Sequence, residues 1–438
     1  MKKATLFFLL LGAISSLHAQ SEQPNVRTGW TFGVLPSFSY DADLGLQLGL
    51  LTNIYYFGDG HTYPEYLHSF YAEAATTSKH YGLYRVSYDS KYLIPGHRLS
   101  VDLTYLPDAM CDFYGFNGYQ TLYLAENLDE VSRAYYKMKR NMFRFSADLQ
   151  GEISKPFYWN VGLGLLNYDN GTVDVDRLNR YANESSDPLP DTTTLFDQYV
   201  ALGLISAAEA KGGAHPYLHG GLTFDTRDRQ QNPHRGMHAD AFLTYYAGLG
   251  TMSDYNNLKF NAAFRHYVPI IDKCLTFAYR LGTQLTLAGN SPFYLNTYVN
   301  QLYMQRVMYE GLGGGNTLRG VLRNRVVGNG FAYANVELRM QVVKFQIGKE
   351  NFYIGLNPFL DGGLVLQPYD MSAVEKVNTV LEDFDLEQST YAPHLGAGCG
   401  LKVAMNDNFV LSVDWATPVD KRDNSKTSNL YIKMGYMF

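Results

Sequence analysis

The stretch LTFAYRLGTQLTL, residues 275–287, decides the fold class, because apolar and polar side chains alternate along it. Successive side chains of a β-strand point to opposite faces, so this alternation sorts the residues onto two faces. One face carries the apolar side chains of Leu275, Phe277, Tyr279, Leu281, Leu285 and Leu287. The other face carries Thr276, Ala278, Arg280, Gly282, Gln284 and Thr286. A strand with one apolar and one polar face is typical of a transmembrane β-barrel, whose wall meets lipid outside and a polar lumen inside.

The same alternation recurs along the chain, for example at 99–105, 260–265 and 409–415. A soluble β-sandwich also alternates, but its strands are usually shorter, about five or six residues. The runs between turn signals predict about 16 strands, an even number as a closed bacterial barrel requires. They are 29–40, 42–57, 64–77, 80–93, 97–107, 135–153, 157–169, 214–228, 235–249, 255–270, 274–289, 330–348, 350–367, 390–406, 408–418 and 429–438. We therefore expect an all-β fold, an antiparallel transmembrane β-barrel.

The N-terminus has the features of a secretory signal peptide. Lys2 and Lys3 precede an apolar run at 4–14, and small residues lead to a cleavage site after Ala19. The run is too short for a membrane anchor, since a spanning helix requires roughly 20 residues. No cysteine stands at the cleavage site, so the lipoprotein form of the signal is not expected. The predicted regions are a signal peptide at 1–19, a short periplasmic segment at 20–28 and the barrel at 29–438.

The composition agrees with a barrel and excludes other classes of protein. Aromatic residues make up 15% of the chain, with 36 Tyr and 25 Phe, which suits aromatic girdles at the two membrane interfaces. The net charge of −6 gives no basic footprint for nucleic acid. The three cysteines, Cys111, Cys274 and Cys399, are widely spaced and form no metal or redox motif. We expect Cys274 and Cys399 to be packing residues rather than a disulfide pair.

The long connections follow odd-numbered strands. They lie at 108–134, 170–213, 290–329 and 369–389, whereas connections after even-numbered strands are mostly short. With a periplasmic N-terminus, this pattern places the long loops outside the cell. The segment 192–210 has helix-like content, and we expect a short helix there as loop decoration, next to a solvent-exposed stretch at 176–191.

The final strand ends on an aromatic residue. Counting back from Phe438, every second residue is apolar, namely Tyr436, Met434, Ile432 and Leu430. A terminal strand of this kind resembles the recognition signal of outer-membrane barrels, and the alternative is a soluble edge strand that happens to end in Phe. Together with the signal peptide, it predicts the outer membrane of a Gram-negative bacterium as the location, with membrane lipid around the wall.

Four motifs carry a resemblance to a known family. The loop after the eleventh predicted strand contains GLGGGNTLRGV at 311–321, and the next strand contains Glu337-Leu338-Arg339. FLDGG stands at 359–363, and LTFDTRD stands at 222–228 with Pro233 and Gly236 after it. Their order and spacing resemble the bacterial surface antigen type of barrel, the superfamily that includes BamA, TamA and the two-partner secretion transporters.

The resemblance implies a long loop that folds back into the lumen and carries the tip Leu318-Arg319-Gly320-Val321. In the family's pattern Asp361 is the partner of Arg319, and alternation along 350–367 places Asp361 on the lumen face. A buried guanidinium must be paired, and its planar fork suits a carboxylate on a rigid wall. Glu337 and Arg339 share the lumen-facing parity of their strand, so we expect them to extend this network.

One departure from the family bears on function. Only about ten residues separate Gln20 from the first predicted strand, so we expect a barrel-only member without the periplasmic POTRA repeats that receive client polypeptides. A separate periplasmic or outer-membrane protein would then have to supply the docking device.

Enzyme signatures are missing from the sequence. We find no H-E-x-x-H, no G-x-S-x-G and no paired Cys/His ligand spacing, and GLGGG lacks the Lys-Ser/Thr of a phosphate-binding loop. His215, His219, His234 and His238 cluster around one strand and turn, and we interpret them as lumen residues rather than metal ligands. We expect no catalytic residues, no metal and no cofactor.

Two hypotheses for function follow from the sequence, and a third possibility, an outer-membrane lipase, would be revealed by lipid turnover in detergent. The resemblance implies a protein that assists insertion or translocation of polypeptides or other cargo at the outer membrane, through a weak seam between the first and last strands. The alternative is a passive outer-membrane channel or a structural component of a surface complex. Conductance in planar bilayers separates the two.

Overall fold

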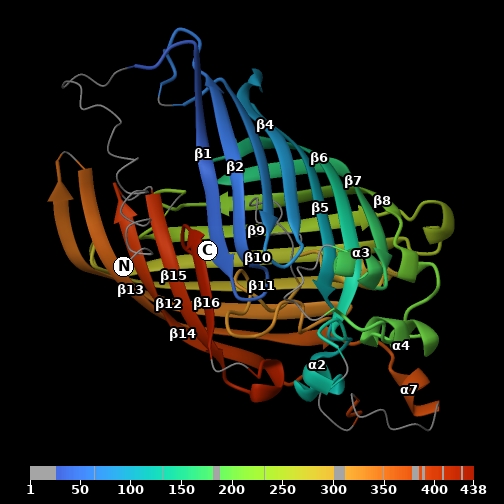
Figure 1. Cartoon of the computed structure of the whole chain (residues 1–438). Helices are drawn as coiled ribbons and strands as arrows, with labels where there is room; N and C mark the ends of the chain where they lie inside the picture. The colour runs from blue at the N-terminus through green and yellow to red at the C-terminus, as the bar shows by residue number, and fades with distance from the viewer. Residues whose placement is uncertain are drawn as a thin grey trace.

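A computed structural model describes residues 26–63, 65–130, 132–180, 188–230, 232–299, 311–348, 350–376, 384–386, 390–406, 409–425 and 428–438. Within these residues the chain forms a closed barrel of antiparallel strands, each hydrogen-bonded to its neighbour in sequence, with β1 next to β16 (Figure 1). The strands are β1 (Trp30–Asp41), β2 (Gly45–Tyr56), β3 (His68–Thr77), β4 (Gly82–Ile94), β5 (His97–Asp112), β6 (Lys137–Ser154), β7 (Phe157–Gly171), β8 (Ala214–Asp225), β9 (Gly236–Tyr246), β10 (Asn257–Ile271), β11 (Leu275–Gly289), β12 (Gly330–Ile347), β13 (Glu350–Gln367), β14 (His394–Met405), β15 (Phe409–Pro418) and β16 (Asn429–Met434).

The predicted barrel is confirmed strand by strand. Two ends differ clearly: β5 runs on to Asp112 instead of ending at 107, and β16 stops at Met434 instead of reaching Phe438. The prediction of a final strand to residue 438 is therefore wrong, because Gly435 takes a φ of +82° and turns the chain out of the wall. The predicted signal peptide and most of the segment 20–28 lie outside the described residues.

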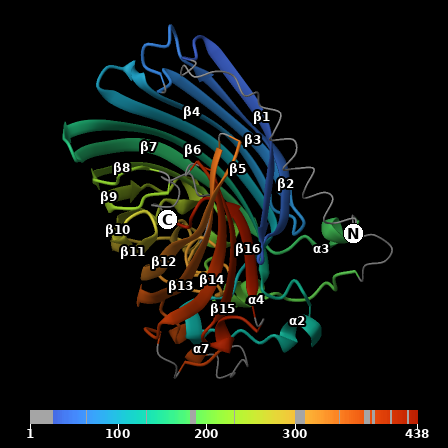
Figure 2. The same cartoon turned by 90° about the vertical axis from the view of Figure 1, so that its left-hand side faces the viewer.

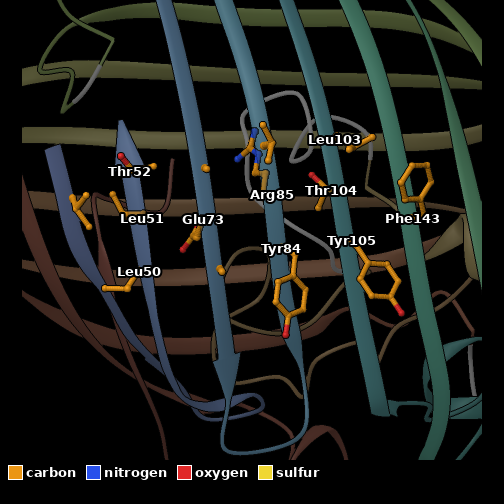
Figure 3. A pocket seen from close by; sticks show the side chains of 14 residues that line it. Leu50, Leu51, Thr52, Glu73, Tyr84, Arg85, Leu103, Thr104, Tyr105 and Phe143 are labelled. Atoms are coloured by element: carbon orange, nitrogen blue, oxygen red, sulfur yellow. The ribbon is translucent and has the colours of Figure 1, made fainter. Parts of the chain in front are cut away.

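Alternation along the strands produces the two faces of the wall. On β4 Tyr84 is 48% exposed and Arg85 is buried, and on β5 Leu103 is exposed and Thr104 is buried. Figure 3 shows these residues among those that line a groove of about 550 Å³ in the wall, together with the exposed apolar residues Leu50 and Tyr105. An apolar outer face and a polar inner face are what the wall of a barrel in a lipid bilayer requires.

The junction between the first and last strands is much weaker than the others. All residues of β1, from Trp30 to Asp41, pair with β2. With β16, in contrast, β1 pairs only at Tyr40–Ile432 and Asp41–Tyr431. In Figure 1 the end of β1 lies beside β16, while its start stands well away from it, and Figure 2 shows the same separation from another side. We call this junction the seam.

The long loops carry the α-helices and close one end of the barrel, and two of the 3₁₀ turns lie in the shorter β9–β10 and β15–β16 connections. The α-helices are α2 (Glu126–Glu130), α3 (Val175–Arg180), α4 (Leu195–Ala201), α5 (Phe293–Asn296) and α7 (Ser372–Lys376), and the 3₁₀ turns are η1 (Gly118–Gln120), η2 (Glu209–Lys211), η3 (Gly250–Met252) and η4 (Lys421–Asp423). Figures 1 and 2 show α2, α4 and α7 gathered at the same end. None of the helices among the described residues has the length and apolar character needed to cross a membrane.

An aromatic cap fills this end of the barrel, and each of the four long loops contributes to it. The rings of Phe113 and Tyr199 pack 5.2 Å apart, those of Phe113 and Phe293 5.8 Å apart, and those of Phe116 and Tyr369 stack at 4.1 Å. The helix predicted within 192–210 is present as α4, whose Thr194 forms a capping box with Asp197. Our interpretation of it as mere loop decoration is wrong, because Leu195, Phe196 and Tyr199 are buried in the cap.

Candidate functional site: the tucked loop in the lumen

The segment 311–327, which we call the tucked loop, lies inside the barrel against the inner faces of β12 to β16. Leu318 and Val321 are fully buried in an apolar cluster with Leu312, Val326 and Val365. Gly320 has a φ of +94°, and a Cβ added to it would meet the main chain of Thr417 at 2.7 Å. Only glycine permits this conformation and this close approach to the wall.

Arg319 is fully buried at the tip of the tucked loop and binds Asp361 on β13 in a bidentate manner. Its Nε donates to Oδ2 at 2.8 Å, and its Nη2 donates to Oδ1 at 3.1 Å. The main-chain N–H of Arg319 also donates to Asp361 Oδ2 at 3.1 Å, so the carboxylate fixes both the side chain and the backbone. The guanidinium carbon lies 3.4 Å from the centre of the Phe359 ring, a cation–π contact.

Two further carboxylates surround the same guanidinium. Arg319 lies 2.9 Å from Glu337 on β12 and 3.2 Å from Asp414 on β15, and all of these side chains are fully buried. Arg339 donates from Nε to Glu337 at 3.0 Å, and Lys402 pairs with Asp414. Three cations therefore face three carboxylates across four strands, which is the balance that buried charges require.

The sequence-predicted residues Arg319, Asp361, Glu337 and Arg339 thus lie in one cluster. Sequence reasoning missed Asp414 and Lys402. Their inward parity is readable from the alternation in their strands, but nothing in the sequence says that β15 and β14 reach the same guanidinium as β13.

A second group of contacts joins the tucked loop to the opposite side of the barrel. Arg323 donates to Asp108 on β5 at 2.8 Å and lies 3.8 Å from Asp112 on the same strand. Both carboxylates lie near the end of β5, just past residue 107, where the sequence analysis predicted that the strand ends. The tucked loop therefore spans the lumen from β5 to β12–β15.

Arg325 ties the tucked loop to the connection between β15 and β16. It donates to the main-chain oxygen of Gly118 at 2.9 Å and lies 3.8 Å from Asp423. Tyr119 donates its hydroxyl to Asp423 at 2.8 Å, and His394 contacts the other oxygen of that carboxylate at 2.5 Å. Burial, followed by the charge of Asp423, raises the pKa of the Tyr119 hydroxyl, which keeps it protonated as a donor.

The inward-facing side chains of β16 all bind the main chain of the tucked loop. Asn429 donates to the oxygen of Gly320 at 3.3 Å, and Lys433 donates to the oxygen of Gly315 at 2.7 Å. Between them, the Tyr431 hydroxyl accepts from the N–H of Gly320 at 3.2 Å. The last strand is thus held by β15 and by the tucked loop, and only slightly by β1.

The C-terminal residues divide into two groups. Leu430 and Met434 are exposed on the outer face of β16, with Ile432 partly exposed on the same parity. After the turn at Gly435, Tyr436 and Phe438 enter the lumen, where the Arg339 guanidinium lies 4.2 Å from the Tyr436 ring and 4.9 Å from the Phe438 ring. Arg339 also donates to the main-chain oxygen of Phe438 at 2.6 Å. We expected all five apolar residues of this series on one face of the last strand. Only the first three lie on the outer face of β16, and the last two lie in the lumen.

The four histidines that lie close together in the sequence each contact a different side chain of the barrel. His215 contacts the Tyr294 hydroxyl at 2.8 Å, His219 lies 2.9 Å from Asp148, and His238 lies 3.3 Å from Asp240. His234 contacts the Gln341 side chain at 3.1 Å. Within the part of the chain that the structure describes, no three His, Cys, Asp or Glu side chains gather in a way that could hold a metal ion.

Comparison with known proteins gives a family and a fold. The sequence model of the Omp85 superfamily domain matches residues 69–438. Among solved structures, BamA from Haemophilus ducreyi lacking POTRA domains 1–3 aligns with a TM-score of 0.55 and 14% identity, over 94% of this chain and 71% of that one. CdiB from Escherichia coli aligns with a TM-score of 0.55 and 11% identity, over 95% of this chain and 63% of that one. At such identities the likeness to these structures concerns the fold alone. No curated protein matches the sequence significantly.

Proposed function

Because this chain belongs to the Omp85 superfamily, whose members are barrels of the Gram-negative outer membrane, we propose that it inserts or translocates polypeptides or other cargo there by opening the seam between β1 and β16. The observation that carries the proposal is the bare edge of β1. From Trp30 to Ser39 this strand has no pairing with β16, since the two strands pair only at Tyr40 and Asp41. An unpaired strand edge presents free N–H and C=O groups that can pair with an incoming extended segment.

The contacts of the tucked loop support a proposal for which side of the seam moves. β16 is bound to the loop through Asn429, Tyr431 and Lys433, and the loop is bound to the wall through Arg319 and Asp361. β1, in contrast, pairs with β2 along its whole length and with β16 only at Tyr40 and Asp41, and the Ser37 hydroxyl donates to Glu73 on β3 at 2.7 Å. We therefore propose that β1 and β2 swing outward while β16 stays in place.

The passive-channel alternative is disfavoured by how the barrel is filled. The tucked loop occupies the lumen against β12–β16, and the aromatic cap of Phe113, Phe116, Tyr199, Phe293 and Tyr369 covers the long-loop end. A wide, permanently open pore requires an unobstructed path through both. We propose in addition that a separate periplasmic or outer-membrane protein delivers the cargo.

A disulfide across the seam tests this function. In a background with Cys111, Cys274 and Cys399 replaced by Ser, the pair Tyr40→Cys and Ile432→Cys joins residues that stand opposite each other in β1 and β16. The matched control, Phe38→Cys with Leu48→Cys, joins opposite residues of β1 and β2. A photo-crosslinking residue at Val34, an exposed position on the bare edge, reports on bound cargo, and one at Leu163 on β7 reports on nonspecific contact.

We expect polypeptide adducts at Val34 that mass spectrometry identifies, that disappear when the seam disulfide is oxidised, and that persist in the oxidised control. Adducts that are as abundant at Leu163, or that survive oxidation of the seam, contradict the proposal. Affinity purification from gently solubilised membranes identifies the delivering partner in the same samples.

A further inference from the structure

Two arginines stand side by side on the lumen wall without a carboxylate between them. Arg265 on β10 and Arg280 on β11 are directly opposite each other in the strand register. Their exposed fractions are 3% and 0%. Like charges at directly opposite positions destabilise a sheet, and a buried charge without a counter-ion is costly. Among the described residues, neither guanidinium has a carboxylate within ion-pair distance, unlike Arg319 nearby.

Both guanidinium groups are held in place with donors to spare. Arg280 donates from Nε to Asn335 at 2.8 Å and from Nη2 to the main-chain oxygen of Asn316 at 2.8 Å, which leaves Nη1 without a partner among the described residues. Arg265 contacts His238 at 3.2 Å through Nη1, and its Nε and Nη2 have no partner within the part of the chain that the structure describes. Such fixed, unfilled donors are what a preorganised anion site presents to its ligand.

Two more donors lie beside this pair. Tyr267 follows Arg265 by two positions on the same face of β10, and its hydroxyl has no partner among the residues that the structure places. The Arg339 guanidinium lies 5.3 Å from the Tyr267 ring, and its Nη1 is also unpartnered. In the register, the small side chain of Ala278 stands between Tyr267 and Glu337. The Phe438 ring covers this area, 5.2 Å from Arg280.

The charges around the site point to an anion. Arg319, Arg339 and Lys402 are matched by Glu337, Asp361 and Asp414 in the cluster described above. Arg265 and Arg280 come in addition to that balanced set. A carboxylate or a phosphate group can accept from two guanidinium forks at once, which a neutral ligand cannot do with the same strength.

We propose that Arg265 and Arg280, with Tyr267 and Arg339, form a lumenal anion site that binds a carboxylate or phosphate group. The ligand is either a free anion or an acidic side chain of a polypeptide in the lumen, and both present the same chemistry to the two arginines. The site does not depend on opening of the seam, so it stands or falls separately from the proposed function.

Isothermal titration calorimetry on the full-length protein in detergent micelles tests the site. The probes are inorganic phosphate, acetate and a hexaglutamate peptide, each at constant ionic strength. The variants are R265Q and R280Q, and R422Q is the matched control, because Arg422 is an exposed loop residue paired with Asp420. Retention of the folded barrel is checked by the heat-dependent shift in gel mobility.

We expect saturable binding of at least one probe by the unmodified protein and by R422Q, and binding weaker by about tenfold or more in R265Q and R280Q, since hydrogen bonds between charged groups are the strong ones. Binding of phosphate or acetate identifies a free anion, and binding of the peptide alone identifies an acidic side chain. R265Q keeps the test decisive if R280Q misfolds, because Arg280 also holds the tucked loop. Absence of saturable binding of any probe, or binding unchanged in folded R265Q, overturns the proposal.

Discussion

Arg319 on the tucked loop and Asp361 on β13 are joined by three hydrogen bonds, two from the guanidinium and one from the main-chain N–H. The third bond makes the position of the loop backbone, and not only that of the side chain, depend on one carboxylate. Glu337 and Asp414 complete a ring of carboxylates around the same guanidinium. Removal of either member of the Arg319–Asp361 pair should therefore release the tip of the loop.

Arg319→Gln should destabilise the barrel by about 3–5 kcal/mol, because it leaves buried carboxylates without their shared cation. The measurement is the shift of the urea unfolding midpoint in detergent, followed by tryptophan fluorescence. Arg319→Asp should destabilise the barrel to a similar extent, and part of the lost stability should return when Asp361 is also changed to Arg. Lack of any recovery in the double variant would argue that the pair does not act as a unit.

Gly320→Ala should displace the tucked loop, because the residue has a φ of +94° and its new Cβ would meet the main chain of Thr417. Backbone strain of this kind costs on the order of 1–3 kcal/mol, and the clash adds to it. Gly203→Ala is the control, since Gly203 has a φ of +74° with open space around it. Protease accessibility of the tucked loop should rise in Gly320→Ala and not in Gly203→Ala. An equal rise in both variants would mean that the positive φ alone, without the clash with Thr417, explains the result.

Arg323→Gln should loosen the attachment of the tucked loop to β5 while the Arg319 cluster stays intact. Hydrogen exchange should speed up in β5 near Asp108 and Asp112, where the carboxylates lose a buried cation. Peptides from β13 serve as the internal control, because Asp361 keeps its partner. Faster exchange that is equal in β5 and β13 would mean general destabilisation instead of a local release.

Deletion of residues 311–321 should raise the conductance of the barrel in planar bilayers. The deletion removes the segment that fills the lumen beside β12–β16, whereas the unmodified protein should show only small, flickering currents. A stable, wide conductance before the deletion would favour the passive channel. A deletion of α3 in the loop between β7 and β8, which removes a similar number of polar residues outside the lumen, controls for general damage.

The wall of this barrel could be predicted from the sequence because a two-residue period needs no knowledge of distant contacts. Leu275–Leu287 and its counterparts reveal strand positions, faces and order through local pattern alone. The end of β16 could not be predicted in this way, since Leu430 to Phe438 keep the period while Gly435 breaks the backbone path. A pattern of side chains does not report a positive φ.

The candidate site was predictable only in the part that a family resemblance covers. Arg319 and Asp361 could be paired from the motif and from strand parity. The contacts of Arg323 with Asp108 and Asp112 depend on the route of the loop across the lumen and on an extension of β5 that the alternation does not indicate. The opposed pair Arg265 and Arg280 depends on the register of β10 against β11, which the sequence leaves open.

The tucked loop has a consequence for how the barrel is built. Arg323 bonds to residues more than two hundred positions before it in the chain, and Arg319 bonds to strands that come after it. Contacts of such separation form slowly, because the entropy of closing the intervening chain is lost before any stabilisation is gained. The lumenal arginines are therefore expected to join late in folding, when β5 and β13 are already in place, so that closure of the wall and docking of the loop become a single cooperative step.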